Sequence, residues 1–268
     1  MIASMRRGLA LLTIVAATLA VVPLQWGILN SGWGDPARLP RHWHRVVSRA
    51  LGLRIRRRGH LAQARPLLIA ANHISWTDIV VLGSLADVTF IAKSDLAGWP
   101  VFGFLSTLQR TVFVERARRG RAGAQAGEIA ARLASRDAVV LFAEGSTGDG
   151  NHLLPFKSTL FGAARLALAD GVDTVWIQPV AIAYTRLHGM PMGRQHRPFA
   201  AWIGDADLVP HLLALTAEGA IDVEVAFGEL VPFTVDSDRK RVARHVQAEV
   251  RRMLSASLRS APAAGPPR

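Results

Sequence analysis

A histidine and an aspartate, His73 and Asp78, lie five residues apart directly after a short apolar run. The run, residues 67–71, has the composition of a buried strand, so His73 would lie at the carboxyl end of that strand, where α/β sheets commonly bind ligands. An imidazole titrates near neutral pH, and it takes a proton from a hydroxyl when a second group fixes its tautomer and stabilises the imidazolium. A carboxylate can do both. The pair therefore predicts a general base, His73, oriented by Asp78.

The spacing of this pair requires a bend in the chain. Five residues is not a same-face spacing on one helix, so we expect His73 in a turn and Asp78 in the first turn of a helix over residues 78–85. Ser75-Trp76-Thr77-Asp78 also fits a Ser-x-x-acid capping box at the start of that helix. The pair alone leaves two interpretations open: Asp78 orients a catalytic histidine, or it only caps a helix.

Strand and helix patterns alternate along the chain, and they must hold this turn in place. The alternation predicts an α/β sandwich, in which helices cover a sheet. Strands are expected over residues 54–59, 66–71, 88–92, 111–114, 138–143, 174–184 and 221–227, and helices over residues 78–85, 120–134, 161–168, 208–216 and 237–258.

The N-terminal segment, residues 8–29, is apolar and follows Arg6-Arg7. A signal peptide would need a small-x-small cleavage site, which residues 18–20 offer only weakly. A simple transmembrane helix would have to include a proline and a glutamine. We favour a helix that enters the bilayer and turns near residues 23–27, with three tryptophans at headgroup depth: Trp26, Trp33 and Trp43.

Two further segments have helical patterns. Residues 41–53 place apolar side chains near one stripe, so this helix lies either on a membrane or on the rest of the fold, and both remain open. The helix over residues 237–258 repeats apolar residues at helical spacing and should dock on the sheet, with its arginines in solvent. The tail, residues 259–268, is expected to be disordered.

The composition narrows the class of partner. Lys and Arg outnumber Asp and Glu by 32 to 20, a formal net charge of +12, which attracts polyanions. The mean hydropathy of +0.22 favours a lipid surface over nucleic acid, and no basic-aromatic recognition module is visible. The sequence has no cysteine, which excludes a thiol nucleophile and thiolate metal sites. Its nine histidines form no metal-binding motif, so no metal is expected.

Four sequence blocks resemble, in order, the motifs of the glycerophosphate and lysophospholipid acyltransferase family. The first is Asn72-His73-x4-Asp78, and the resemblance covers residues 66–184. It implies a glycerophosphate acyltransferase-like sandwich with a mixed sheet, and direct acyl transfer with His73 as the base. The other three blocks are Phe113-Val114-Glu115-Arg116, Phe142-Ala143-Glu144-Gly145-Ser146-Thr147 and Ile177-Gln178-Pro179-Val180-Ala181-Ile182-Ala183-Tyr184.

The resemblance also implies roles for the remaining site residues. Arg116 would hold the anionic head group of the acceptor in bidentate fashion. Glu144, Gly145 and Ser146 would form a second turn beside His73, where Gly145 lets a ligand approach the backbone. Two lysines match basic positions of the family, Lys93 and Lys157, and two residues are expected to be structural at the site, Asn72 and Pro179.

The third motif departs from that of many phosphate-acceptor members, which read Phe-Pro-Glu-Gly-Thr-Arg. Here Ala143, Ser146 and Thr147 replace the proline, threonine and arginine, so a cation that binds phosphate is missing. The extended block over residues 144–158 resembles the subgroup that acylates lyso-ornithine lipid. We therefore expect lyso-ornithine lipid as the main acceptor, with 1-acyl-sn-glycerol-3-phosphate as the alternative.

The implied reaction sets the expected partners and location. The donor would be an acyl thioester of acyl carrier protein or coenzyme A, with no cofactor. A complete span would leave Arg6-Arg7 in the cytoplasm and the catalytic domain on the other side, away from cytosolic thioesters. We therefore expect membrane-associating helices over residues 1–53 and a catalytic domain over residues 54–258, on the cytoplasmic face of an anionic inner membrane. A non-catalytic basic protein that binds membrane surfaces would share the same charge and apolar segment.

Overall fold

A mixed sheet forms the centre of the computed structural model, which describes residues 2–114, 122–169, 171–204 and 206–259. The strand order is β1-β8-β6-β2-β5-β3-β4, and β7 and β9 also pair with β6. β2 is parallel to both β5 and β6, whereas β8 is antiparallel to β6. The strands are β1 (Leu53–Arg58), β2 (Leu67–Ala71), β3 (Thr89–Lys93), β4 (Val112–Val114), β5 (Ala138–Phe142), β6 (Val175–Leu187), β7 (Met190–Pro191), β8 (Ile221–Phe227) and β9 (Val231–Phe233).

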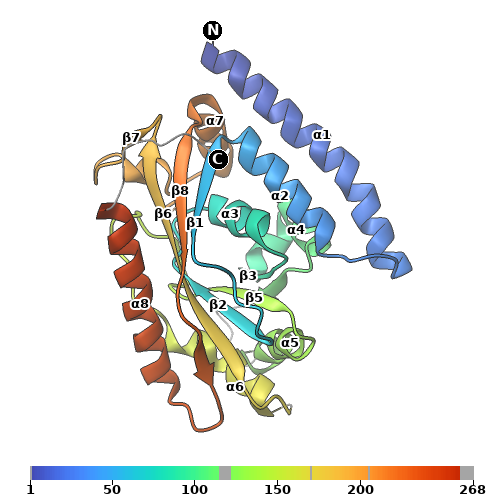
Figure 1. Ribbon diagram of the computed structural model, residues 1–268. Helices are drawn as coiled ribbons and strands as arrows, with labels where there is room; N and C mark the ends of the chain where they lie inside the picture. Colours follow the sequence, from blue (N-terminus) through green and yellow to red (C-terminus); the bar gives the residue numbers. More distant parts are fainter. Residues whose placement is uncertain (1, 115–121, 170, 205, 260–268) are drawn as a thin grey trace.

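Helices cover both faces of this sheet (Figure 1). On one side lie α1 (Ile2–Ser31), α2 (Arg38–Ala50), α3 (Thr77–Leu85), α4 (Pro100–Leu108) and α7 (Leu208–Glu218); on the other lie α5 (Ala122–Ala134), α6 (Gly162–Ala169) and α8 (Arg239–Arg259). Short 3-10 turns are η1 (Ser94–Gly98), η3 (Ser158–Phe161) and η4 (Arg197–Phe199). The predicted α/β fold with a mixed, helix-covered sheet is confirmed.

The central strands explain why there are two hydrophobic cores. β2 and β5 are continuous apolar runs, as expected for parallel strands buried on both faces. Alternate residues of β2 point to opposite sides: Leu68 and Ala70 pack in the core under α8, while Leu67 and Ile69 pack in the core under α2 and α3. The sheet therefore holds the carboxyl end of β2 rigidly between two packed layers.

The prediction of a turn near residues 23–27 within the N-terminal helix is wrong. α1 runs unbroken from Ile2 to Ser31 and passes through Pro23. The chain turns only after it, where Gly32 and Gly34 have positive φ angles of 69° and 87°. The buried Gln25 stabilises the helix beyond the proline, because its side-chain amide donates to the carbonyls of Pro36 and Leu108 at 2.8 and 3.0 Å.

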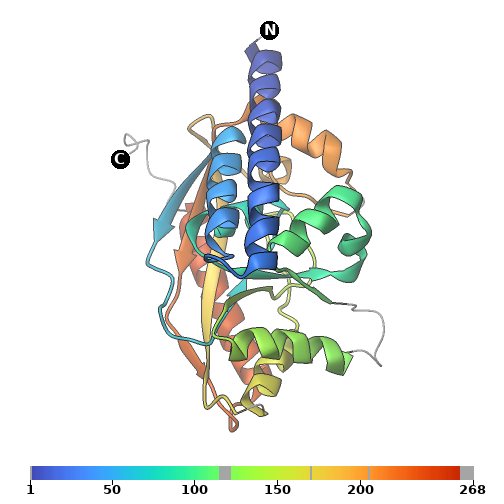
Figure 2. The ribbon, with the colours of Figure 1, turned by 90° about the vertical axis from the view of Figure 1, so that its right-hand side faces the viewer.

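The second helix, α2, packs on the fold rather than standing apart from it. Its Val47, together with Leu51, belongs to the core shared with α3. Trp43 is half-buried and donates to the Thr18 hydroxyl of α1 at 2.9 Å. Trp26 and Trp33 are exposed. Figure 2 shows α1 and α2 side by side.

α1 has the length and apolarity of a membrane-crossing helix, and it is the one such helix in the described part of the chain. It nevertheless contacts the rest of the protein near both of its ends. Arg6 donates to the carbonyl of Thr216 in α7, and Gln25 reaches α4. Its other face exposes apolar side chains, among them Met5, Leu9, Leu12, Val15 and Leu19.

Candidate active site

The chain leaves β2 through Asn72, whose side chain continues the sheet. The Asn72 amide donates to the Ile182 carbonyl at 2.9 Å and accepts from the Ile182 N–H at 2.8 Å. This pair of bonds imitates a backbone ladder between β2 and β6. It fixes where the following turn begins, so Asn72 has a structural role at the base of the site.

The turn brings His73 and Asp78 together. The Nδ1 of His73 lies 2.8 Å from Oδ2 of Asp78. The same oxygen accepts the backbone N–H groups of Ile74 and Ser75 at 2.6 and 2.9 Å, and Oδ1 accepts the hydroxyl of Tyr184 at 2.8 Å. Asp78 is completely buried, and these four donors satisfy its carboxylate.

The two interpretations of Asp78 turn out to be compatible. α3 begins at Thr77, and Asp78 accepts the Ser75 N–H as the acid of a capping box does. The serine half of that box does not form, because the Ser75 hydroxyl has no partner among the described residues. A single carboxylate oxygen thus holds both the start of the helix and the imidazole of His73.

The imidazole of His73 is fixed on two sides. Its ring stacks on Phe142 with centroids 3.9 Å apart and planes 13° from parallel. With Nδ1–H donated to Asp78, Nε2 carries the lone pair, and it makes no hydrogen bond to a described residue. The side chain is 18% exposed. Nε2 is therefore placed to accept a proton from an incoming hydroxyl.

Glu144 holds the backbone of the site. Its carboxylate accepts the N–H of His73 at 2.7 Å and that of Leu154, also at 2.7 Å. The Gly148 N–H in turn donates to the carbonyl of His73 at 2.8 Å. Burial raises the pKa of Glu144 to about 7. Both oxygens accept backbone amides, so Glu144 holds the backbone that carries His73.

Gly145 and Lys157 lie against one another beside this turn. Gly145 has a φ of 76°, and a Cβ atom there would lie only 2.9 Å from Nζ of Lys157. A larger residue would displace the lysine side chain. Lys157 and Ser146 are both exposed, so they form the solvent-facing side of the site.

Of the other predicted site residues, two lie wholly or partly outside the described residues and one lies within the sheet. Lys93 is the last residue of β3, and its side chain lies outside the described residues, as does the whole of Arg116 after β4. Pro179 pairs with Ala70 in the middle of the sheet. It falls where the antiparallel partner of β6 changes from β9 to β8, a position where a missing N–H is tolerated. Its carbonyl accepts the Gly228 N–H, so Pro179 has a structural role.

Two aromatic residues at the site were not singled out from the sequence. Tyr184 ends the fourth motif and reaches Asp78 from β6, while Phe142 opens the third motif and supports the ring of His73. Both residues lie within the motifs that resemble the acyltransferase family, and this position is the feature of the sequence that could have identified them. Trp76 donates to His211 of α7 at 2.9 Å, and no local pattern predicts a partner so far along the chain.

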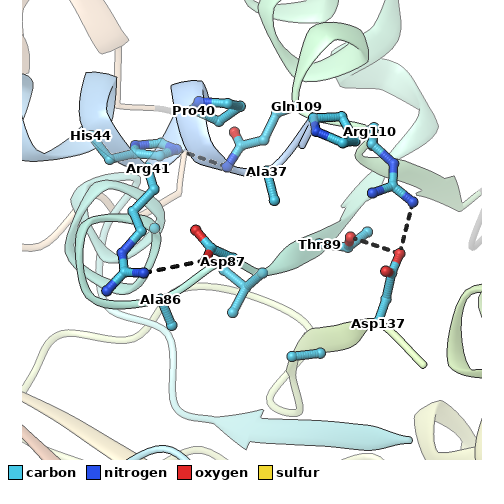
Figure 3. Close-up of a pocket in the computed structure, with 14 residues that line it drawn as sticks. Ala37, Pro40, Arg41, His44, Ala86, Asp87, Thr89, Gln109, Arg110 and Asp137 are labelled. Atoms are coloured by element: carbon cyan, nitrogen blue, oxygen red, sulfur yellow. Dashed lines mark hydrogen bonds and ion pairs between the residues drawn. The ribbon is translucent and has the colours of Figure 1, made fainter. Parts of the chain in front are cut away.

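Figure 3 shows a separate pocket. It lies at the amino ends of central strands, since it is lined by Thr89 and Ala138, the first residues of β3 and β5, whereas His73 lies two residues beyond the carboxyl end of β2. Its polar walls pair with each other: Arg41 with Asp87 at 3.2 Å, Arg110 with Asp137 at 3.0 Å and Gln109 with His44 at 2.7 Å. Within the described residues, no group of three or more His, Cys, Asp or Glu could hold a metal ion.

Comparison with known proteins agrees with this geometry. A family model described as Acyltransferase matches residues 52–183. Lyso-ornithine lipid O-acyltransferase of Brucella abortus is 53% identical over 96% of this chain and 97% of its own length. 1-acyl-sn-glycerol-3-phosphate acyltransferase of Neisseria gonorrhoeae is 37% identical over 70% of this chain and 69% of its own length.

A crystal structure of the 1-acyl-sn-glycerophosphate (LPA) acyltransferase from Thermotoga maritima has the same fold. The two structures match with a TM-score of 0.62 over 94% of this chain and 96% of the other, at 20% sequence identity. The resemblance seen in the four motifs is confirmed, and a non-catalytic membrane-binding protein is set aside. The chain belongs to the acyltransferase family, and it is a membrane-associated acyltransferase.

Proposed function

We propose that this protein transfers a fatty acyl chain from an acyl thioester to the free hydroxyl of a lysolipid, with lyso-ornithine lipid as the main acceptor. The observation that carries the proposed chemistry is the pair of the partly exposed His73 and the buried Asp78, with Nε2 of His73 left available. The similarity to the lyso-ornithine lipid O-acyltransferase of Brucella abortus, which extends over nearly the whole length of both chains, supports this acceptor.

The proposed reaction is a direct displacement. Nε2 of His73 takes the proton of the acceptor hydroxyl, and the oxygen attacks the thioester carbonyl carbon. Asp78 stabilises the imidazolium through Nδ1–H. The C–S bond then breaks, and the leaving thiolate takes the proton from His73. The products are the acylated lipid and the free thiol of acyl carrier protein or coenzyme A, and the step uses no other cofactor.

The third motif favours lyso-ornithine lipid over a phosphate acceptor. Thr147 stands where many phosphate-acceptor members have an arginine, and an arginine grips phosphate by two parallel hydrogen bonds. The alternative acceptor, 1-acyl-sn-glycerol-3-phosphate, is supported by the similarity to the 1-acyl-sn-glycerol-3-phosphate acyltransferase of Neisseria gonorrhoeae. Lys157 beside Gly145 is a cation that would serve either head group.

The decisive experiment is lipid analysis of a deletion strain complemented with wild type or with His73→Ala. We expect lyso-ornithine lipid to accumulate in the deletion strain and to be consumed only with the wild-type chain. Accumulation of 1-acyl-sn-glycerol-3-phosphate instead would show the alternative acceptor. Competition between the two acceptors in one purified assay, run with each thioester donor in turn, then ranks acceptors and donors together.

We further propose that the enzyme works on the cytoplasmic face of the inner membrane. α1 contacts the domain near both ends, at Arg6 and at Gln25, which supports a helix lying along the membrane surface beside the domain. That arrangement keeps the active site on the side where cytosolic thioesters are available, and anionic lipid would attract the basic chain. Protease digestion of sealed inside-out and right-side-out vesicles tests this location, because cleavage only in inside-out vesicles is expected.

A further inference from the structure

Outside α1, the exposed large hydrophobic side chains of the described residues are densest at one place. Four of them lie within six residues, on α4 and just before it: Trp99 (40% exposed), Val101 (61%), Phe102 (39%) and Phe104 (49%). Residues 96–109 contain no charged side chain. A helix that faces water is expected to carry polar residues on its outer face, so this exposed face requires an explanation.

The exposure is not that of a loosely attached helix. The carboxyl end of α4 is tied to the fold at three successive residues. The Leu108 carbonyl accepts Gln25 of α1, Gln109 bonds the buried imidazole of His44, and Arg110 pairs with Asp137 (Figure 3). Burial lowers the pKa of His44 to about 4, so the imidazole is neutral and adds no charge to this contact.

α4 lies beside α1, and both helices expose apolar side chains. Gln25, which joins the two helices, has the exposed neighbours Leu24 and Trp26 in the sequence, each of which is 59% exposed. Figure 2 shows α4 beside the carboxyl-terminal half of α1. The opposite side of the molecule is different in kind, because the exposed positions of α8 are mostly basic: Lys240, Arg241, Arg244, His245, Arg251, Arg252 and Arg259.

We propose that α4 is a second membrane-contacting element, which inserts Trp99, Val101, Phe102 and Phe104 into the same lipid leaflet as α1. Three of these side chains are aromatic, as is usual at the level of lipid head groups. α4 also connects β3 to β4 at one edge of the sheet. A bilayer that covers α4 would therefore contact this edge of the sheet as well as α1.

The absence of native cysteine gives a direct test. Single cysteines at Val101→Cys and Phe104→Cys are labelled with an environment-sensitive fluorophore in the full-length protein. The labelled protein is then mixed with phosphatidylethanolamine–phosphatidylglycerol vesicles that do or do not contain a lipid-attached quencher. Leu12→Cys on α1 is the positive control, and Ala248→Cys, exposed on α8, is the matched negative control.

We expect the two α4 labels to be quenched as strongly as the α1 label, and the α8 label to be unaffected. Quenching at α1 without quenching at α4 would overturn the proposal. A second outcome would also overturn it: a blue shift of the α4 labels in the absence of vesicles, increasing with protein concentration. That result would mean that a second copy of the chain covers this face. Neither readout depends on the acceptor, so a wrong acceptor would leave this test intact.

Charged substitutions on α4 test whether its contact with the membrane matters for vesicle binding and activity. Val101→Asp combined with Phe104→Asp should weaken vesicle binding about tenfold or more, since two side chains lose their burial in lipid. It should raise KM for acceptor in vesicles but not for acceptor dispersed in detergent. Ala248→Asp on α8 is the control for added charge and should change neither quantity. Unchanged vesicle affinity in a folded Val101→Asp/Phe104→Asp variant would contradict the proposal.

Discussion

Two buried carboxylates hold the turn at His73, and they do so in different ways. Asp78 binds the imidazole itself, together with two backbone amides and the hydroxyl of Tyr184. Glu144 binds only backbone amides, one in the turn at His73 and one at Leu154. Asp78 therefore contacts the imidazole that takes the proton, whereas Glu144 fixes the backbone position of His73.

The difference separates chemistry from positioning within one site. A negative charge next to Nδ1 stabilises the imidazolium that forms during transfer. A negative charge that meets only amide dipoles stays costly to bury, and the raised pKa of Glu144 reflects that cost. Substitutions at the two carboxylates should therefore differ in size and in kind.

The largest loss of activity is expected at His73, which both carboxylates hold in place. His73→Ala removes the base, and kcat should fall by about 10²- to 10⁴-fold. The side chain is partly exposed and Asp78 keeps three other donors, so thermal unfolding should change little. Turnover is measured with a purified acyl thioester and lysolipid, with circular dichroism to verify folding. Wild-type turnover by a folded His73→Ala protein would contradict the proposed mechanism.

Asp78→Asn tests the chemical half of the comparison. The amide oxygen can still accept from the turn and from Nδ1–H, but the charge is gone, so kcat should fall by about 10³-fold. Because Asp78 acts through His73, the double variant His73→Ala/Asp78→Asn should be no slower than His73→Ala alone. Losses that multiply in the double variant would mean that Asp78 contributes independently of the histidine.

Only part of this arrangement was accessible from the sequence. The apolar run over residues 67–71 and the turn after it predicted where His73 lies, because strand ends are local features. Tyr184 and Leu154 reach the same turn only through the order β6-β2-β5, and no local pattern reports which strands are neighbours. The turn expected near Pro23 failed for a similar reason: the side-chain N–H₂ of Gln25 donates to the carbonyl of Leu108, which is 83 residues away.

Glu144→Gln tests the positioning half. A carboxamide has one acceptor oxygen, so either the His73 or the Leu154 N–H loses its partner and the turn shifts. A misplacement of about 1 Å is expected to lower kcat by up to about 10²-fold, which is less than the loss at Asp78. KM for the acceptor should change little if Glu144 touches no substrate. A large rise in KM with unchanged kcat would instead assign Glu144 to substrate binding.

The stability of wild type relative to this variant should depend on pH in a defined direction. Burial raises the pKa of Glu144 from 4.5 to about 7. The protonated form is thus favoured in the folded state, and its stabilising contribution is complete below pH 4.5 and is lost as pH rises through about 7. The free energy of unfolding of wild type relative to Glu144→Gln should fall over this range by up to about 3 kcal/mol. Urea unfolding at several pH values measures it, and parallel pH curves would contradict it.

The smallest effect is expected at Tyr184, which supports Asp78 from the side away from the imidazole. Tyr184→Phe removes one of four donors and keeps the ring in the core, so kcat should fall by about tenfold or less. Burial, with the nearby charge of Asp78, raises the pKa of Tyr184 well above its usual value of 10.0, so the hydroxyl keeps its proton at every working pH. The ratio of wild-type to Tyr184→Phe rates should therefore be constant from about pH 6 to about pH 9. A ratio that changes across this range would mean that Tyr184 exchanges a proton during transfer, which would make it a chemical partner of the histidine rather than a support for Asp78.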